Sequence, residues 1–255
     1  MVETEQTERI NAVERSLTII DTLQELDGAR VMELADYLDW APSTVHSHLK
    51  TLEHHRYLIK EGDIYHIGLE FLNRGGHARE RKKAYRLAGD IVDELADETE
   101  ERAQFIVEEH GRGIYLYTAT GKRAVQVRSR LGRVKPLHNS AAGKAILSRL
   151  PEERVAEIVD MWGLEQSTEY TITDYDELLE ELDEVRSRGV SFNRQESVKG
   201  LHALAVPVVN AHGQPIGAFG LSGPSNRFKN DLFETELPDL LLGAANELEL
   251  KITYS

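Results

Sequence analysis

The segment Ala142-Gly143-Lys144-Ala145 is a candidate for phosphate chemistry. A P-loop needs a glycine five positions before its Gly-Lys pair and a Ser or Thr directly after it. This chain has His138 and Ala145 at those positions, so the nucleotide-binding interpretation fails. The segment suits the start of a helix better, because the free N–H groups and positive dipole end around residues 139–142 attract a carboxylate.

Polar residues and small apolar residues surround that helix start. His138 adds a hydrogen-bond donor, and the small side chains of Ala141 and Ala142 permit a ligand to approach closely. Asn139 or Ser140 is the expected N-cap, because both types accept a bond from the first free N–H groups. For Ser140, capping is an alternative to ligand contact.

Other reactive constellations are lacking in the sequence. The chain has no cysteine, which excludes thiol nucleophiles, disulfides and cysteine-ligated metals, and it has no Gly-x-Ser-x-Gly motif. Among its ten histidines, His138 and His202 are able to meet in one pocket, but no third ligand is evident. We therefore predict a protein that is not an enzyme and that needs no metal and no cofactor.

A second polar constellation suits nucleic acid. Short donors and one cation line the free face of a helix expected from Pro42 onward, because proline is well tolerated in a first helical turn. Such side chains near a helix start fit the major groove of DNA. The candidate DNA-binding residues are Pro42, Ser43, Thr44, His46, Ser47, His48 and Lys50.

The elements around this helix predict a winged helix-turn-helix. Residues 9–26 carry an apolar stripe of helical period, and a shorter helix is expected from Val31 to Leu38. Residues 57–60 and 64–67 read as two strands joined at Gly62, which is free to adopt a positive φ. The alternative is a helical hairpin within a larger fold, without DNA binding.

Composition sets the environment. The 255 residues carry 30 basic and 44 acidic side chains, a net charge of -14, and only ten of the basic residues are lysine. Within residues 42–60 the net charge is +2, so the expected DNA face is locally basic.

No apolar run of membrane-spanning length and no signal-peptide pattern is present, so we expect a cytoplasmic protein. Abundant carboxylates with scarce lysine favour a halophilic archaeon, and an ordinary acidic protein is the alternative.

The pattern changes along the chain. Residues 1–68 are expected to form the winged helix domain, 69–98 a helical linker with a break at Gly75-Gly76, and 99–255 an effector-binding domain. In this last part, strands are predicted at 103–108, 113–117, 124–128, 201–209 and 215–222, with helices at 139–150, from Pro151, at 174–188 and at 234–251. Strands, then helices, then strands indicate an α+β fold with a mainly antiparallel sheet.

The chain resembles the IclR family of transcriptional regulators from end to end. The resemblance rests on Ser43-Thr44-Val45-His46, Tyr65-His66-Ile67-Gly68, residues 138–145, Glu196, Gly200, residues 205–208 and Leu221-Ser222-Gly223-Pro224. Two positions depart from the family pattern: Ser47 stands where the family commonly has Arg, and His55 lies where it commonly has Gly. The loss of the arginine weakens the case for a strong phosphate or base contact at Ser47.

The resemblance implies a winged helix domain, a linker helix and a GAF-like effector domain. It implies a homodimer, or a dimer of dimers, that binds a palindromic operator and answers to a small organic acid, aromatic acid or sugar-derived effector, acting on a carbon catabolic pathway. It implies effector contacts at His138, Asn139, Ser140, Ala141, Ala142, Glu196, Ala203, Gly220 and Ser222, although core packing is the alternative for Ala203 and Gly220.

Arg128, Arg130 and Arg133 lie shortly before residues 138–142 in the sequence. They would favour an anionic effector if they reach the effector pocket. Two rival functions remain for the whole chain: a small-molecule-binding enzyme built on the GAF-like domain, and a protein-interaction module that does not bind specific DNA.

Overall fold

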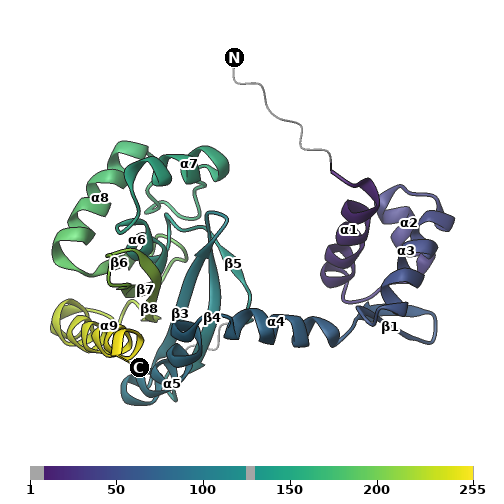
Figure 1. Cartoon of the computed structure of the whole chain (residues 1–255). Helices are drawn as coiled ribbons and strands as arrows, with labels where there is room; N and C mark the ends of the chain where they lie inside the picture. The colour runs from purple at the N-terminus through teal and green to yellow at the C-terminus, as the bar shows by residue number, and fades with distance from the viewer. Residues whose placement is uncertain (1–8, 125–129, 255) are drawn as a thin grey trace. The chain divides into compact units, whose positions relative to one another are not determined.

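The computed structural model describes residues 9–124 and 130–254. They divide into two compact units, Met1–Ala78 and Arg79–Ser255, which Figure 1 shows in purple to blue and in blue to yellow. The division of the chain at residues 68 and 98 remains a proposal.

The first unit is a winged helix-turn-helix. It contains the helices α1 (Asn11–Glu25), α2 (Val31–Leu38) and α3 (Pro42–His54), and then an antiparallel hairpin of β1 (Leu58–Glu61) and β2 (Ile64–Ile67). Pro42 is the first residue of α3, and Gly62 has a φ of 64° at the hairpin turn, both as the sequence predicts. The predicted order of helices and hairpin is confirmed.

The core of this unit draws one face from each helix. Leu34 of α2 and Val45 and Leu49 of α3 are fully buried against Ile19 and Leu23 of α1. The apolar stripe expected on α1 divides in two, however. Its first three members, Ile10, Val13 and Leu17, are more than half exposed, whereas Ile19 and Leu23 farther along the helix are buried.

The break expected at Gly75-Gly76 is absent. Both glycines lie inside α4 (Glu70–Glu80), and the chain leaves the helix only at residues 81–82, before α5 (Lys83–Thr99) begins. Glycine in a helix costs about 1 kcal/mol relative to alanine, which one helix tolerates. The side chains of the break residues themselves make contacts, since Arg81 pairs with Glu109 and Lys82 lies over the Tyr85 ring.

The second unit is built on a six-stranded sheet in the order β5-β4-β3-β8-β7-β6, with every pairing antiparallel. Its strands are β3 (Arg102–Glu109), β4 (Arg112–Thr120), β5 (Val134–Lys135), β6 (Ser191–Arg194), β7 (Leu201–Val209) and β8 (Pro215–Pro224). The predicted α+β class is confirmed. The strand expected at 124–128 lies almost wholly outside the described residues, and β5 and β6 were not predicted.

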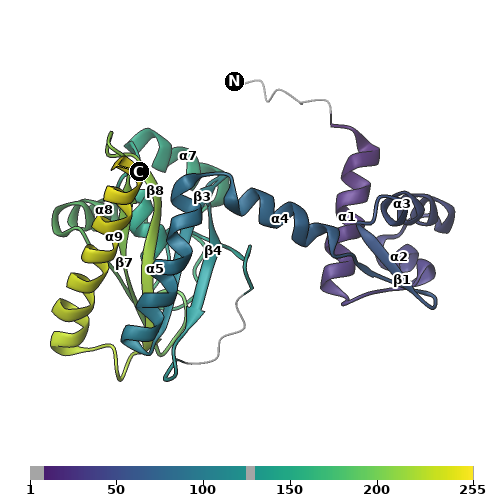
Figure 2. The same cartoon turned by 60° about the horizontal axis from the view of Figure 1, so that its bottom comes forward.

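Helices cover both faces of this sheet. On one face lie α5 and α9 (Leu237–Tyr254), which run side by side in front of the strands in Figure 2. On the other face lie α6 (Ala141–Leu147), α7 (Glu152–Trp162) and α8 (Tyr175–Arg188). A single π-helical turn, η1 (Leu232–Glu236), leads into α9.

The two faces of the sheet differ in chemistry. The face toward α5 and α9 is aromatic and aliphatic, and Phe105 and Phe219 pair across β3 and β8 with ring centroids 4.8 Å apart. The face toward α6 carries small and polar residues. Among the described residues, no helix is long and apolar enough to cross a membrane.

Candidate functional sites

The exposed face of α3 forms the first candidate site, for DNA. Pro42, Ser43, His46, Ser47 and Lys50 are all exposed. Apart from Pro42 at the helix start, they recur every three or four residues, so they share one surface of the helix. Thr51 and His54 continue the same surface and are exposed as well, although the sequence did not single them out as contacts.

Two of the candidate DNA-binding residues lie apart from this face. Thr44 and His48 are half-buried, and the Nδ1 of His48 lies 2.9 Å from the Oγ of Ser16 in α1. His48 therefore holds α3 against α1, which sets the angle of the exposed face.

The charge on the exposed face is modest. Lys50 forms an ion pair of 2.9 Å with Glu53 one turn later, and that pairing raises the pKa of the lysine. Arg30, the residue before α2, lies 2.6 Å from Asp63 at the hairpin tip, so that arginine is also engaged. The surface is therefore suited to hydrogen bonding with bases more than to a dense set of phosphate contacts.

The second candidate site is a cavity of about 190 Å³ between the sheet and the start of α6. Its floor consists of two neighbouring rows of residues that pair across the strands. One row runs Asn193, Ala203, Ser222, Arg102, and the other includes Gly220 and Gln104. Directly paired residues project from the same face of a sheet, which explains how residues so distant in sequence meet.

The start of α6 forms the wall above this floor. Ser140 is the N-cap, and its Oγ accepts a bond of 3.1 Å from the N–H of Gly143. A side chain at Gly143 would collide with the backbone, because its Cβ would lie 2.1 Å from the carbonyl oxygen of Leu137. Gly143 thus serves the close packing of α6 on the preceding loop.

The cavity is rich in positive charge. Arg102 and Lys135 reach it from β3 and β5, and Arg133 reaches it from the loop before β5. Among the described residues that line it, none is acidic. Burial lowers the pKa of Arg102, and burial together with Arg133 lowers that of Lys135, so both cations are held at a cost.

Arg102 is the most confined of the three cations. It is 7% exposed, its Nε lies 3.3 Å from the Thr118 hydroxyl, and its Nη2 is buried with no hydrogen-bond partner among the described residues. Beside it, burial raises the pKa of Tyr115, so the phenol stays protonated and is able to donate. A buried, unpaired cation is unusual, since such groups normally find a counter-charge.

Seven of the nine predicted effector-binding residues line this cavity: Asn139, Ser140, Ala141, Ala142, Ala203, Gly220 and Ser222. The other two lie elsewhere. His138 points the other way and its Nε2 lies 3.1 Å from the carbonyl of Glu165, in surroundings that lower the pKa of the histidine by burial. Glu196 is drawn away by the buried Lys144, whose Nζ lies 2.8 Å from it.

Lys144 is the centre of a buried ionic cluster behind the cavity. It also binds Glu181 at 3.1 Å, and that carboxylate in turn binds Arg188 at 2.9 Å. Burial raises the pKa of Glu196 in spite of the nearby lysine. The lysine of the Gly-Lys pair therefore joins α6 to α8 and the β6–β7 loop, and it does not face the cavity.

Sequence reasoning missed part of the lining. Arg102, Gln104, Tyr115 and Lys135 all contribute, and the Nε2 of Gln104 donates to the Oγ of Ser222 at 2.8 Å. Of the three arginines expected near the entrance, Arg133 lines the cavity, Arg130 is exposed and does not, and Arg128 lies outside the described residues. The part of the chain that the structure describes contains no group of three or more His, Cys, Asp or Glu residues arranged to hold a metal.

Both units match known families. Residues 12–62 match the IclR helix-turn-helix domain, and residues 78–250 match the C-terminal domain of bacterial IclR transcriptional regulators. A probable HTH-type transcriptional regulator ArcR from Halobacterium salinarum is 34% identical over 96% of this chain and 94% of its own length.

Solved structures agree with these matches. The Thermotoga maritima IclR structure superposes with a TM-score of 0.81 at 25% identity, over 96% of this chain and 100% of that one. The inducer-binding domain of an Acinetobacter PobR double mutant, in complex with 3-hydroxybenzoic acid, is 31% identical with a TM-score of 0.58, over 64% of this chain and 96% of its own. This chain belongs to the IclR family and is a transcriptional regulator, not an enzyme, with a DNA-binding helix-turn-helix domain and a C-terminal ligand-binding domain.

Proposed function

We propose that this regulator binds a specific operator and that a small organic anion in the cavity beside α6 controls its affinity for DNA. One observation carries the proposal: three cations converge on a cavity in which no described lining residue is acidic. An anionic ligand would supply the missing counter-charge and hydrogen-bond acceptors for Arg102.

The size of the cavity restricts the ligand. A space of about 190 Å³ lies below the usual range for drug-sized ligands and is close to that of a cavity known to hold benzene. We therefore infer a compact acid from a carbon catabolic pathway, with one carboxylate and a short or single-ring body. The 3-hydroxybenzoic acid of the PobR complex belongs to this class and supports the inference.

Each wall has a proposed role. Arg102, Arg133 and Lys135 hold the carboxylate, while Ala141, Ala142, Ala203 and Gly220 leave room for the body of the ligand. Polar atoms of Asn139, Ser140 and Ser222 bind a second oxygen. His138 and Glu196 support the wall from behind without touching the ligand.

On DNA, we propose that Pro42, Ser43, His46, Ser47 and Lys50 of the exposed α3 face lie in the major groove, with Thr44 and His48 setting the position of the helix. The ion pairs of Lys50 with Glu53 and of Arg30 with Asp63 imply that base-edge contacts carry much of the binding energy, and at high salt phosphate attraction is weakened further.

A homodimer, or a dimer of such dimers, is the proposed working form. The exposed apolar side chains of Val13 and Leu17 on α1, and of Ile10 directly before it, recur at helical spacing, and a second copy of the same helix would cover them. We expect Leu17→Glu to lower the molecular mass measured in solution and to weaken operator binding. An unchanged mass would exclude α1 from the interface.

The decisive experiment combines occupancy with cavity filling. Genome-wide occupancy of the tagged protein on two carbon sources should give a few sharp sites that change with the carbon source. Ser222→Phe fills the cavity and should abolish that change while operator binding persists, whereas Asn226→Phe, at an exposed site nearby, should behave as wild type. Absence of discrete sites would contradict the regulatory proposal, and an unchanged response in Ser222→Phe would contradict the cavity assignment.

A further inference from the structure

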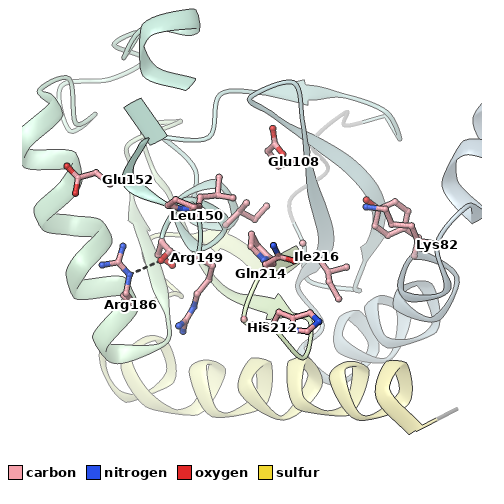
Figure 3. A pocket seen from close by; sticks show the side chains of 16 residues that line it. Lys82, Glu108, Arg149, Leu150, Glu152, Arg186, His212, Gln214 and Ile216 are labelled. Carbon is pink, nitrogen blue, oxygen red and sulfur yellow. Dashed lines mark hydrogen bonds between the residues drawn. The ribbon is translucent and has the colours of Figure 1, made fainter. Parts of the chain in front are cut away.

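A second and larger hollow lies at the opposite end of α6. It is a groove of about 830 Å³, more than four times the volume of the inner cavity. The end of β3, the start of α5, the segment from α6 to α7, α8 and the β7–β8 turn form its sides. Figure 3 shows Lys82 and Arg186 on opposite sides, with Arg149, Gln214 and Ile216 between them.

The floor of this groove holds apolar side chains, although the groove as a whole exposes more polar than apolar surface. Ile146 and Tyr85 are buried beneath it, and Leu150, Pro215 and Ile216 are half-buried along it. Apolar side chains at the bottom of a concave surface gain free energy when a ligand displaces water from them. The groove therefore suits a ligand with an apolar body.

Basic side chains surround that floor. Lys82, Arg149 and Arg186 line the groove together with two carboxylates, Glu108 and Glu152. These cations stand out because residues 79–255 carry 23 basic and 30 acidic side chains, and therefore repel anions overall. A local excess of positive charge on an acidic unit marks a place where an anion is favoured.

Several of these charged side chains already have partners within the protein, which limits the number that could bind an anion. Glu108 accepts bonds from Arg154 at 3.4 Å and from the N–H of Gly111 at 2.7 Å. Arg186 donates to the carbonyl of Ser148 at 3.0 Å and pairs with Asp183.

Arg149 differs from them. Its Nε is buried and has no hydrogen-bond partner, and no carboxylate lies within ion-pair distance of its guanidinium among the described residues. An unsatisfied donor of this kind is costly in the free protein, and an acceptor from a ligand would remove that cost.

We propose that this groove is a second ligand site, for an amphipathic anion. The apolar body of the ligand lies on Leu150 and Ile216, and its carboxylate, phosphate or sulfonate group binds Arg149, with Lys82 adding charge at the rim. The inner cavity is too small for such a ligand, so the two sites take different molecules.

The two sites share one helix. All seven residues of α6 are buried, its start lines the inner cavity and Ile146 near its end lies under the groove. A short helix packed on every side moves as one body, so a ligand at one end changes the space at the other. Occupation of the groove is therefore expected to alter the affinity of the inner cavity.

Fluorescence titration of the full-length protein with 8-anilinonaphthalene-1-sulfonate tests the site, because this probe joins a sulfonate to an aromatic body. Wild type should bind one probe per chain in a saturable manner. Arg149→Gln should weaken binding about tenfold or more, the usual effect of losing a charged hydrogen bond. Ile216→Asn should weaken it as well, by making the floor polar.

Three controls separate the groove from other causes. Arg130→Gln and Lys229→Gln, at exposed cations outside both the groove and the inner cavity, should bind the probe as wild type does. N-phenyl-1-naphthylamine, which lacks the sulfonate, should bind at least tenfold more weakly. The proposal is overturned by absence of saturable binding, by equal affinity of Arg149→Gln and wild type, or by equal affinity of the neutral probe.

Discussion

Replacement of Arg102 by methionine should stabilise the ligand-free protein and, in the same molecule, weaken its response to anions. The side chain is 7% exposed, and no carboxylate among the described residues pairs with it. Its burial lowers the pKa, which means that the folded protein holds the positive charge at a cost that the unfolded chain does not bear. Because the guanidinium stays charged at neutral pH, the cost is present throughout the working range.

The expected magnitude follows from two opposing changes. Removing the buried ion stabilises the folded protein by part of a desolvation penalty of several kcal/mol. Losing the 3.3 Å hydrogen bond to Thr118 destabilises it by about 1 kcal/mol. A net gain of about 1–2 kcal/mol in the free energy of unfolding would raise Tm by roughly 2–8 °C for a unit of this size. Loss of a charged hydrogen bond should weaken binding of a small carboxylate about 10- to 100-fold.

Thermal unfolding with and without a panel of small carboxylates and their neutral amides measures both effects. Arg102→Lys keeps the charge and should retain part of the ligand-induced rise in Tm, and Arg133→Met, at an exposed side chain, should leave the Tm of the free protein unchanged. If Arg102→Met lowers Tm without ligand and responds to carboxylates as wild type does, then the arginine is structural and the reasoning fails.

Three further predictions concern other parts of the chain. Gly143→Ala should destabilise the protein by several kcal/mol in denaturant titrations, because the new methyl group collides with the backbone of Leu137. Gly76→Ala should instead stabilise it by about 0.5–1 kcal/mol, because that helical position is open. Equal effects of the two substitutions would contradict the packing argument. Burial lowers the pKa of His138, so the unfolded chain binds its proton first and stability should fall as pH drops below about 6.5; His138→Asn should show a flatter curve than wild type, and parallel curves would refute this. Lys50→Ala should weaken operator binding and reduce the slope of log affinity against log salt by about 1 or less, and an unchanged slope would show that this lysine makes no phosphate contact.

Local patterns predicted the elements well. The N-cap at Ser140, the turn at Gly62 and the long strands β7 and β8 each follow from residue types within a few positions of one another. The strand β6 was not predicted, because Ser191–Arg194 is a short, mostly polar edge strand without the alternating pattern that indicates a strand.

The cavity was predicted only in part, for a different reason. Small residues in the sequence indicate the start of α6 and the closing strands. Arg102 and Gln104 reach the cavity only because β3 pairs with β8, and Gln104 is 118 residues from its hydrogen-bond partner Ser222. Sequence spacing does not reveal which strands are neighbours. The same limit applies to His48, whose direction depends on where α1 packs against α3.

The alternation of side chains along the strands makes this regulator a tractable starting point for biosensor engineering. Arg102, Gln104, Ala203 and Ser222 line the inner cavity, while immediate neighbours such as Ala103 and Phe105 belong to the hydrophobic core on the opposite face. If the proposed effector site is correct, randomising these four cavity-lining positions would change the chemical preference and leave the core intact. A library confined to these codons should therefore yield many folded variants with new inducers, which libraries spread over α6 would not.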